Sequence, residues 1–340
     1  MSRQACILIT GASGEIGHGL IEHLAAGSSR PIITLDLKPL VPELAGRVLQ
    51  QFTGDILNTQ LLEQITSRYE VEQVFHLAAL LSTSSEFSPA LAHKVNVEGT
   101  LNVLEFAQKQ GEWRGKPVIF FYPSSIAAYG LPGLAAKSTA KPVREDEFNR
   151  PTTMYGANKL YCEHLGRYYE RHYRQLAADP QAGKVDFRCI RFPGLISAVT
   201  VPSGGTSDYA PEMIHAAAQQ HPYDCFVRAD TRIPFMAMPD AVAAVLKLVA
   251  APKSALSRTE YNIGAFAPSA GEVEAIVRKS FPTAVIRYEV DVHRQRIVDS
   301  WPAEVDDSAA RHDWGHAPRY DLASAFGEYL IPGIRAYYRR

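Results

Sequence analysis

Tyr155 and Lys159 are the pair of residues whose types and spacing most clearly suggest chemistry. They stand four apart in "MYGANK", residues 154–159, so on a helix both side chains project from one face. A phenol with an ordinary pKa of about 10 is only ~0.1% ionised at neutral pH, which is too little for a general base. Bringing that pKa near 7 requires ~4 kcal/mol of preferential stabilisation of the phenolate, to which a lysine ammonium one turn away would contribute.

The same stretch also permits a structural role, because tyrosines on helices often pack or lie at interfaces. The predicted helix, "MYGANKLYCEHLGRYYERHYRQL", carries four further tyrosines, Tyr161, Tyr168, Tyr169 and Tyr173. Tyr155 differs from them because "VIFFYPSSIAAYG" precedes the helix. That segment predicts a buried strand ending in two serines, at the edge where parallel sheets usually bind ligands. A hydroxyl from Ser125 would there hold a reacting oxygen in line, so we favour an acid/base role for Tyr155.

A glycine-rich segment near the N-terminus predicts a site for a phosphorylated cofactor. In "ILITGASGEIG", Gly11, Gly14 and Gly17 follow an apolar predicted strand and open a predicted helix. Glycines there let the backbone approach a pyrophosphate, whose charge lies against the free amide groups of the helix N-terminus. The triplet alone is weak evidence, since tight strand-to-helix turns use glycine without any ligand.

Asp36 strengthens this prediction. The second predicted strand, "IITLD", ends at Asp36, nineteen residues after Gly17, where a carboxylate can accept hydrogen bonds from an adenosine ribose. A helix cap or a surface acid is the alternative. An acid here repels a 2′-phosphate, so NAD is favoured over NADP, a preference that Lys38 weakens slightly. The positive nicotinamide ring would join Lys159 in lowering the pKa of Tyr155.

The elements that must position these residues follow an α/β pattern. Short β-branched or aromatic runs, such as "CILIT", "IITLD", "QVFHLA" and "VIFFYPS", alternate with longer helical patterns. This alternation predicts a Rossmann-type, doubly wound parallel sheet with helices on both faces. We expect residues 1–180 to form the NAD-binding domain, with 186–194 and 239–264 returning to it. A smaller C-terminal substrate-binding lobe would comprise 195–238 and 265–340, and the longest loops would be 130–151 and 177–185.

Composition excludes several classes of function. Among 340 residues, 46% are hydrophobic and the formal net charge is -1, which offers no general attraction for nucleic acid or an anionic membrane. No stretch approaches the roughly 20 apolar residues of a membrane span, and the N-terminus enters an apolar strand almost at once, so no signal peptide is expected. Four widely spaced cysteines indicate neither a zinc site nor a disulfide framework. A cytoplasmic protein without nucleic-acid or membrane partners is expected.

His312 and His316 are a weak candidate for a metal site. Their i, i+4 spacing in "HDWGH" could bind zinc on a helix, but a glycine lies between them and no third ligand is evident. We therefore expect no metal.

The motifs together resemble the extended short-chain dehydrogenase/reductase family. The resemblance rests on four motifs in order, "TGASGEIG", "FHLAA", "PSSIAAYG" and "YGANK", which are far more specific together than any one alone. It implies Ser125, Tyr155 and Lys159 as the catalytic residues and selects Ser125 over Ser124. The implied cofactor-binding residues, besides Tyr155 and Lys159, are Gly11, Gly14, Glu15, Ile16, Gly17, Asp36, Asp55, Ile56, Ala78, Ala79, Leu80, Asn96, Pro193 and Leu195.

Within that family, the C-terminal half is similar to the short-chain type of L-threonine 3-dehydrogenase. The segments that carry this likeness are "RFPGLISAVTVPSGGTSDYA", "DTRIPFMAMPDA" and "DSWPAEVDDSAARHDWG". The likeness implies a substrate site formed, with Ser125 and Tyr155, by Leu81, Ser82, Gly194, Gly205, Thr206, Ser207 and Trp301. Glycines followed by hydroxyl residues offer donors to a small carboxylate. The alternative is that "PSGGTSD" is a turn that caps the next helix, and both roles are compatible, because a helix N-terminus also binds anions.

The resemblance implies NAD-dependent oxidation of L-threonine to 2-amino-3-oxobutyrate. Tyr155 would be the general base, Lys159 would tune it and hold the ribose, and Ser125 would orient the hydroxyl. One alternative is a UDP-sugar 4-epimerase of the same family, although "RFPG" at 191–194 lacks the asparagine that such epimerases tend to have. The other alternative is a catalytically silent NAD sensor. The presence of Ser125, Tyr155 and Lys159 argues against it. Helices over 88–110 and 151–176 could form a four-helix bundle in a homodimer, as in relatives.

Overall fold

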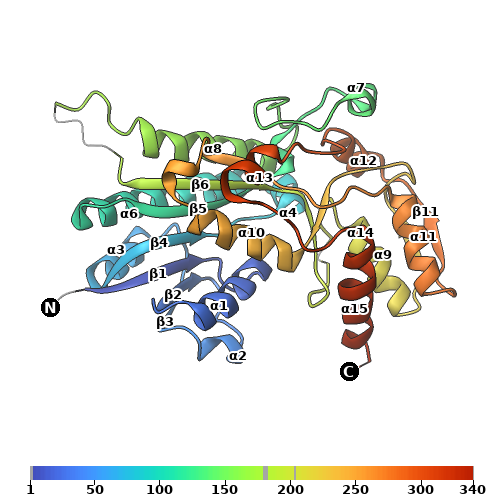
Figure 1. Cartoon of the computed structure of the whole chain (residues 1–340), viewed down its shortest axis with the longest axis horizontal. Helices are drawn as coiled ribbons and strands as arrows, with labels where there is room; N and C mark the ends of the chain where they lie inside the picture. The colour runs from blue at the N-terminus through green and yellow to red at the C-terminus, as the bar shows by residue number, and fades with distance from the viewer. Residues whose placement is uncertain (1–2, 179–182, 203, 340) are drawn as a thin grey trace.

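The central feature is a seven-stranded parallel sheet (Figure 1). The computed structural model describes residues 3–178, 183–202 and 204–339. The strand order is β10-β6-β5-β4-β1-β2-β3, and every neighbouring pair is parallel. The strands are β1 Gln4–Thr10, β2 Ile32–Asp36, β3 Gln50–Thr53, β4 Tyr69–His76, β5 Val118–Ser125, β6 Val185–Phe192 and β10 Glu260–Asn262. The predicted Rossmann-type α/β fold is confirmed.

Helices cover both faces of this sheet, as the nearly continuous apolar strands require. Ile7 and Ile9 of β1 join a core cluster with α1 Glu15–Gly27 and α10 Met238–Ala250. Cys6 and Leu8, which point the other way, join a second cluster with the helices of the opposite face. Those helices are α3 Thr59–Arg68, α6 Gly99–Arg114 and α8 Met154–Arg171. The alternation along β1 follows from the two-residue period of a strand.

Shorter elements lie in the connections between the strands and helices of the central sheet. They are α2 Pro42–Ala45, α4 Ser82–Phe87, α5 Pro89–His93, the π-turn η1 Lys94–Glu98, the 3₁₀ turns η2 Ile126–Ala128 and η3 Lys253–Ala255, and α7 Leu134–Thr139. The helix predicted over 88–110 is thus α5, η1 and α6 in succession. The one predicted over 151–176 is shorter, because the structure begins α8 at Met154 and ends it at Arg171.

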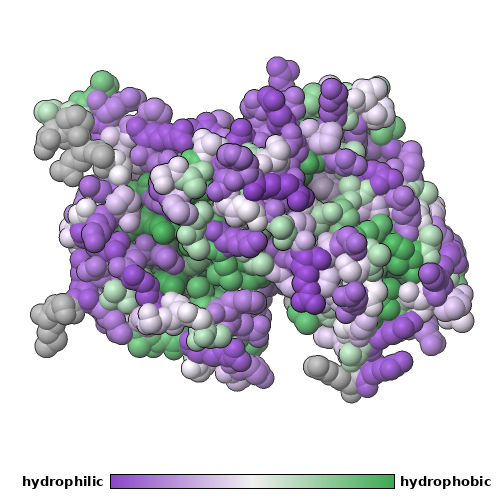
Figure 2. All heavy atoms as spheres, viewed as in Figure 1, coloured by the Kyte–Doolittle hydropathy of each residue, from purple (hydrophilic) through white to green (hydrophobic). Residues whose placement is uncertain are grey.

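The C-terminal half adds a third core cluster, which includes Tyr209, Phe235 and Phe326. Two small parallel pairs support it, β7 Gly194–Ile196 with β9 Phe235–Ala237 and β8 Tyr223–Cys225 with β11 Ile286–Tyr288. Its helices are α9 Tyr209–Ala218, α11 Ala270–Ser280, α12 Val292–Asp299, α13 Ser308–Trp314, α14 Leu322–Ser324, the π-turn η4 Ala325–Leu330 and α15 Ile331–Tyr337. Figure 2 shows the surface indented between the sheet part and the part that carries α9, α11 and α15.

Segments from the second half of the chain also enter the central sheet. Strands β6 and β10 lie side by side at one edge of it, and α10 packs against α1. The division into an NAD-binding domain and a substrate-binding lobe at the predicted boundaries stays a proposal.

Two predicted loops differ in outcome. The segment 130–151 contains α7, and Val143 forms an isolated bridge with Val305, so it is an ordered excursion. Of the other predicted loop, 177–185, residues 179–182 lie outside the described residues.

Strand β3 was not anticipated, because "QQFT" is polar at its start and lies at the sheet edge. Within the described ranges, no helix is both long and apolar enough to span a bilayer.

Candidate active site

The glycine segment forms a tight turn between β1 and α1. Gly11 has φ +68°, and a Cβ there would lie 2.4 Å from the backbone nitrogen of Ala78, so only glycine fits. A Cβ at Gly17 would lie 2.4 Å from the carbonyl oxygen of Ala12. Gly14, the N-cap of α1, is exposed, and a Cβ there would lie 3.4 Å from its nearest atom, the Gly11 oxygen. An open helix N-terminus with a bare backbone therefore fits a dinucleotide pyrophosphate.

Asp36 lies beside this turn, at the carboxyl end of β2. Its Oδ2 accepts a hydrogen bond from the Ser13 amide at 2.9 Å, and its Oδ1 accepts one from the Lys38 amide at 3.0 Å. Each carboxylate oxygen keeps a free lone pair, so the residue can still accept ribose hydroxyls. The carboxylate acceptor of Asp36 and the glycine turn both fit NAD.

Asn96 has a role that the sequence did not reveal. It is 1% exposed, and its amide Oδ1 accepts from the Leu80 nitrogen at 2.8 Å while its Nδ2 donates to the Leu80 oxygen at 3.1 Å. The side chain therefore fixes the 77–81 segment, which carries the predicted residues Ala78, Ala79 and Leu80. Asn96 therefore positions that segment, and its predicted direct contact with the cofactor stays a prediction.

The remaining predicted cofactor residues lie at nearby turns. Glu15 and Ile16 open α1; burial raises the pKa of Glu15, whose Oε1 has no hydrogen-bond partner among the described residues. Asp55 Oδ1 accepts from the Leu57 amide at 2.9 Å, and Ile56 packs against Gly99. Pro193 and Leu195 follow β6, with Leu195 in β7.

The three predicted catalytic residues come from two neighbouring elements. Ser125 ends β5, whereas Tyr155 and Lys159 lie one turn apart in α8. Helix α8 begins where it does because Thr153 caps it, its Oγ1 accepting from the Gly156 amide at 3.0 Å. A Cβ at Gly156 would lie 2.0 Å from the Ala127 oxygen. This glycine therefore lets the first turn of α8 pack directly on the turn that follows Ser125.

The two serines at the end of β5 have different surroundings. Ser124 is buried, and its Oγ donates to Glu163 Oε1 at 2.5 Å. Glu163 also accepts two bonds from Arg191, at 2.8 and 2.6 Å, in a pair whose side chains are each 1% exposed. Ser125 is only partly buried, and its Oγ accepts from the Ala127 amide at 3.1 Å, which leaves its hydrogen to donate. Ser125 is thus the serine available to a ligand.

Lys159 is deeply buried below Tyr155. It is 2% exposed, its Nζ donates to the Pro123 oxygen at 2.6 Å, and it lies 5.4 Å from the centre of the Tyr155 ring. Burial lowers the pKa of Lys159 to about 8, because a desolvated ammonium is disfavoured.

The protein surroundings of Tyr155 oppose its ionisation. The side chain is partly buried, and burial raises the pKa of its phenol above the ordinary value. Within the protein alone, desolvation by burial outweighs any lowering of this pKa by the Lys159 ammonium. Positive charge that arrives with a ligand would have to reverse this shift before Tyr155 could act as a base.

The predicted substrate segments meet each other in the structure. Thr206 Oγ1 donates to Ser82 Oγ at 3.3 Å, and Thr83 Oγ1 donates to the Gly204 oxygen at 2.9 Å. Leu81 is exposed, whereas Ser207 is partly buried. Ser203, in the same loop, lies outside the described residues.

Two residues near this loop were missed by sequence reasoning. Asp208 Oδ2 accepts from the Gly205 amide at 2.6 Å, so this predicted donor is already paired. Arg294 Nη2 donates to the Gly204 oxygen at 2.7 Å and holds the loop from α12. The Asp208 contact is local and lies within the turn considered for "PSGGTSD", whereas Arg294 lies 90 residues from Gly204, so no local signal indicated its contact.

Two further predicted residues are packed rather than exposed. A Cβ at Gly194 would lie 2.6 Å from the Phe235 ring. Trp301 is 4% exposed and belongs to the C-terminal core cluster, against which Tyr155 also packs. Trp301 therefore packs in the core, and its predicted contact with the substrate stays a prediction.

The two histidines considered for zinc do not share a helix. Helix α13 ends at Trp314, and Gly315 has φ +69°. His312 is exposed, while His316 is buried near the Gly264 oxygen. In the described part of the chain, no group of three potential ligands gathers.

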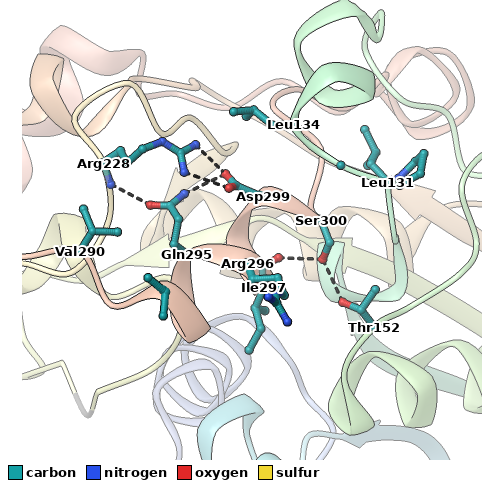
Figure 3. Close-up of a pocket in the computed structure, with 13 residues that line it drawn as sticks. Leu131, Leu134, Thr152, Arg228, Val290, Gln295, Arg296, Ile297, Asp299 and Ser300 are labelled. Carbon is teal, nitrogen blue, oxygen red and sulfur yellow. Dashed lines mark hydrogen bonds and ion pairs between the residues drawn. The ribbon is translucent and has the colours of Figure 1, made fainter.

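A separate pocket of about 540 Å³ lies between the 131–134 segment and α12 (Figure 3). Its polar groups bond to one another: Arg228 makes two 3.0 Å bonds to Asp299, and Ser300 pairs with Thr152. None of the predicted site residues lines it.

Comparisons with known proteins agree with this geometry. The NAD dependent epimerase/dehydratase family matches residues 7–264. The mitochondrial L-threonine 3-dehydrogenase of Bos taurus is 37% identical over 324 residues, which cover 94% of this chain and 80% of that protein. A monomeric L-threonine 3-dehydrogenase from a metagenome database, in its apo form, has 35% identity and a TM-score of 0.84, covering 97% of this chain and 99% of its own. The GalE-like L-threonine dehydrogenase from Cupriavidus necator, in its holo form, has 35% identity and a TM-score of 0.82, covering 98% and 99%.

Proposed function

Because the chain belongs to the NAD-dependent epimerase/dehydratase family, we propose that this NAD-using enzyme is an L-threonine 3-dehydrogenase. It would oxidise the side-chain hydroxyl of L-threonine and form 2-amino-3-oxobutyrate. The similarity to threonine dehydrogenases over more than nine tenths of the chain supports the substrate. The placement of Ser125, Tyr155 and Lys159 around the junction of β5 and α8 supports the chemistry.

The single observation that carries the proposed mechanism is the different state of the two serines. The Ser124 hydroxyl donates to Glu163, whereas Ser125 keeps a hydrogen to donate at the end of β5, next to the turn on which the start of α8 packs. Ser125 would hold the substrate oxygen in line, and Tyr155 would accept its proton. When bound, NAD supplies the acceptor for the hydride from the hydroxyl-bearing carbon and a positive charge near the phenol.

Lys159 would complete the site from below. Its ammonium is fixed by the Pro123 oxygen, so it can stabilise a developing phenolate without rearrangement. Residues 204–207 and the start of α4 would hold the carboxylate and amino groups of the substrate. We propose Gly11, Gly14, Gly17 and Asp36 as the main protein groups toward the dinucleotide.

The experiment that tests this function measures NADH absorbance when the purified chain is given L-threonine and NAD. D-Threonine and L-serine serve as controls for the substrate, and NADP serves as the control for Asp36. We expect a rise with L-threonine and NAD. Interconversion of UDP-hexoses without oxidation of L-threonine would replace this proposal with the epimerase. Binding of NAD without either reaction would favour the silent sensor.

We also propose a homodimer formed as a four-helix bundle through the helices predicted over 88–110 and 151–176, which are α5, η1, α6 and α8. Exposed apolar or aromatic side chains on these helices support it, namely Leu91, Leu101, Tyr161 and Tyr168. The cytoplasm remains our proposed location, with the four buried cysteines unpaired; the Bos taurus relative is mitochondrial.

A further inference from the structure

The Lys159 ammonium lies in a site that lacks a carboxylate partner. In the described part of the chain, no acidic oxygen lies within ion-pair distance of its Nζ. Glu163, one turn further along α8, is engaged by Ser124 and Arg191. Lys159 donates its hydrogen bond to the Pro123 carbonyl, which is neutral. A buried charge with so little compensation needs another source of stabilisation.

Tyr122 occupies the place where that stabilisation can arise. Its ring centre lies 4.6 Å from Lys159 Nζ, closer than that of Tyr155 at 5.4 Å. Tyr122 is 2% exposed, and the one polar group that its hydroxyl meets among the described residues is the buried Cys162 thiol, a weak hydrogen-bond partner. The ring face of Tyr122 offers the Lys159 ammonium a stronger interaction, because it attracts a desolvated cation.

We propose that Tyr122 is a positioning residue, whose ring face stabilises the Lys159 ammonium and holds it beneath Tyr155 by a cation–π interaction. This inference rests on the proposed function for its catalytic meaning. Its physical content, an ammonium held by an aromatic face, is independent of the substrate.

Of the other groups around Lys159, Glu163 also favours the ammonium, but its carboxylate is already engaged by Ser124 and Arg191. The groups that face Lys159, besides Tyr122, are His76 on β4, Tyr155, Cys162 and Glu163 on α8, and Cys189 on β6. Burial lowers the pKa of His76 to about 3 and raises the pKa of both cysteine thiols. These three groups are therefore neutral near pH 7. Removing the negative ring face would disfavour the charged form of Lys159, so its pKa would fall further.

The test replaces Tyr122 with phenylalanine and then with mono-, di- and trifluorinated phenylalanine, which weaken the ring face at nearly constant volume. The pKa of Lys159 is read directly by NMR of the chain with ¹³C-labelled lysine, and Lys159→Met identifies the signal. We expect phenylalanine to match the wild type closely, since it keeps the ring face and removes only a hydroxyl that meets the neutral Cys162 thiol. The pKa should then fall with each fluorine, by about one unit across the series.

Phe187 provides the matched control. Its ring stacks on Tyr122 at 6.0 Å and is fully buried, yet it makes no contact of this kind with Lys159. The same fluorinated series at position 187 should leave the Lys159 pKa unchanged. An unchanged or rising Lys159 pKa across the series at position 122, or an equal fall in both series, would overturn the inference. If the wild type fails to oxidise threonine, the proposed function falls while this titration still decides the inference.

Discussion

Tyr155 is the residue on which the proposed chemistry depends, and its environment opposes ionisation until charge arrives. Burial raises the pKa of its phenol, and Lys159 lies below the ring at 5.4 Å. In the proposed mechanism, Tyr155 would therefore become an effective base only in the assembled complex.

Replacing Tyr155 with phenylalanine tests this role. The variant keeps the ring and its packing, so NAD binding and folding should remain near the wild type. The turnover rate with L-threonine should fall by about 10²- to 10⁴-fold, the usual contribution of a general base. Steady-state kinetics and a fluorescence titration with NADH measure the two quantities. Full turnover in Tyr155→Phe would remove the residue from the mechanism.

The neighbouring serines offer a matched pair of variants. Ser125→Ala should lower kcat/KM for L-threonine and leave the free energy of unfolding nearly unchanged. Ser124→Ala should do the reverse, because it removes a buried donor to Glu163 and costs about 1–3 kcal/mol of stability. Kinetics combined with urea unfolding separate the two effects. Equal losses of activity at equal stability would contradict the distinction between the serines.

At the scale of elements, the contact between α8 and the end of β5 sets the site geometry. Gly156→Ala would place a Cβ 2.0 Å from the Ala127 oxygen, so α8 would have to move. We expect a loss of both turnover and thermal stability, with a stability cost of about 1–3 kcal/mol. Gly27→Ala in α1, where a Cβ meets no atom within 4 Å, is the control. Similar activity in both variants would argue against this packing account.

Asp313 joins α13 to the segment before β10 and gives a pH dependence. Its burial raises the pKa, but hydrogen bonds from His312, Ser257 and Tyr261 outweigh this effect and hold the pKa below its usual range. A depressed carboxyl pKa contributes stability that is present above the unfolded-state pKa of about 4 and is lost as the pH falls. Urea unfolding should therefore show that Asp313→Asn is destabilised near neutral pH, and that its difference from the wild type shrinks below about pH 4. A constant difference would contradict this linkage.

The central strands and the glycine turn could be predicted because their signals are local. Apolar runs such as β1 and β5 are buried on both faces, and the spacing from Gly17 to Asp36 is visible in the chain. The Asn96 bonds to Leu80 and the Arg294 bond to Gly204 could not be predicted, since they join residues 16 and 90 positions apart. Strand β3 and helix α7 were missed because neither has a strong apolar period.

At the scale of the whole molecule, the sheet brings segments from both halves of the chain to one site. Ser125 and Tyr155 come from the first half, and the 204–207 loop, held by Arg294 of α12, meets Ser82 at the start of α4. The proposed site therefore needs both parts of the chain in place.

The proposed dimer is tested by sedimentation velocity. Because Leu91 and Tyr161 are more than half exposed on the proposed interface, we expect a dimer in the wild type. Leu91→Glu with Tyr161→Glu should shift it to a monomer, while glutamate at the exposed Val292 of α12 should not. A monomeric wild type would contradict the proposed dimer. The relative from the metagenome database is described as monomeric.

The most direct test of the central claim is a crystal structure of the chain with NAD and an unreactive analogue that keeps the L-threonine side-chain hydroxyl. We predict that this hydroxyl lies about 2.6–3.2 Å from Tyr155 Oη and within hydrogen-bond reach of Ser125. An analogue bound with its hydroxyl directed away from both residues, or Tyr155 Oη covered by protein side chains, would contradict the assignment.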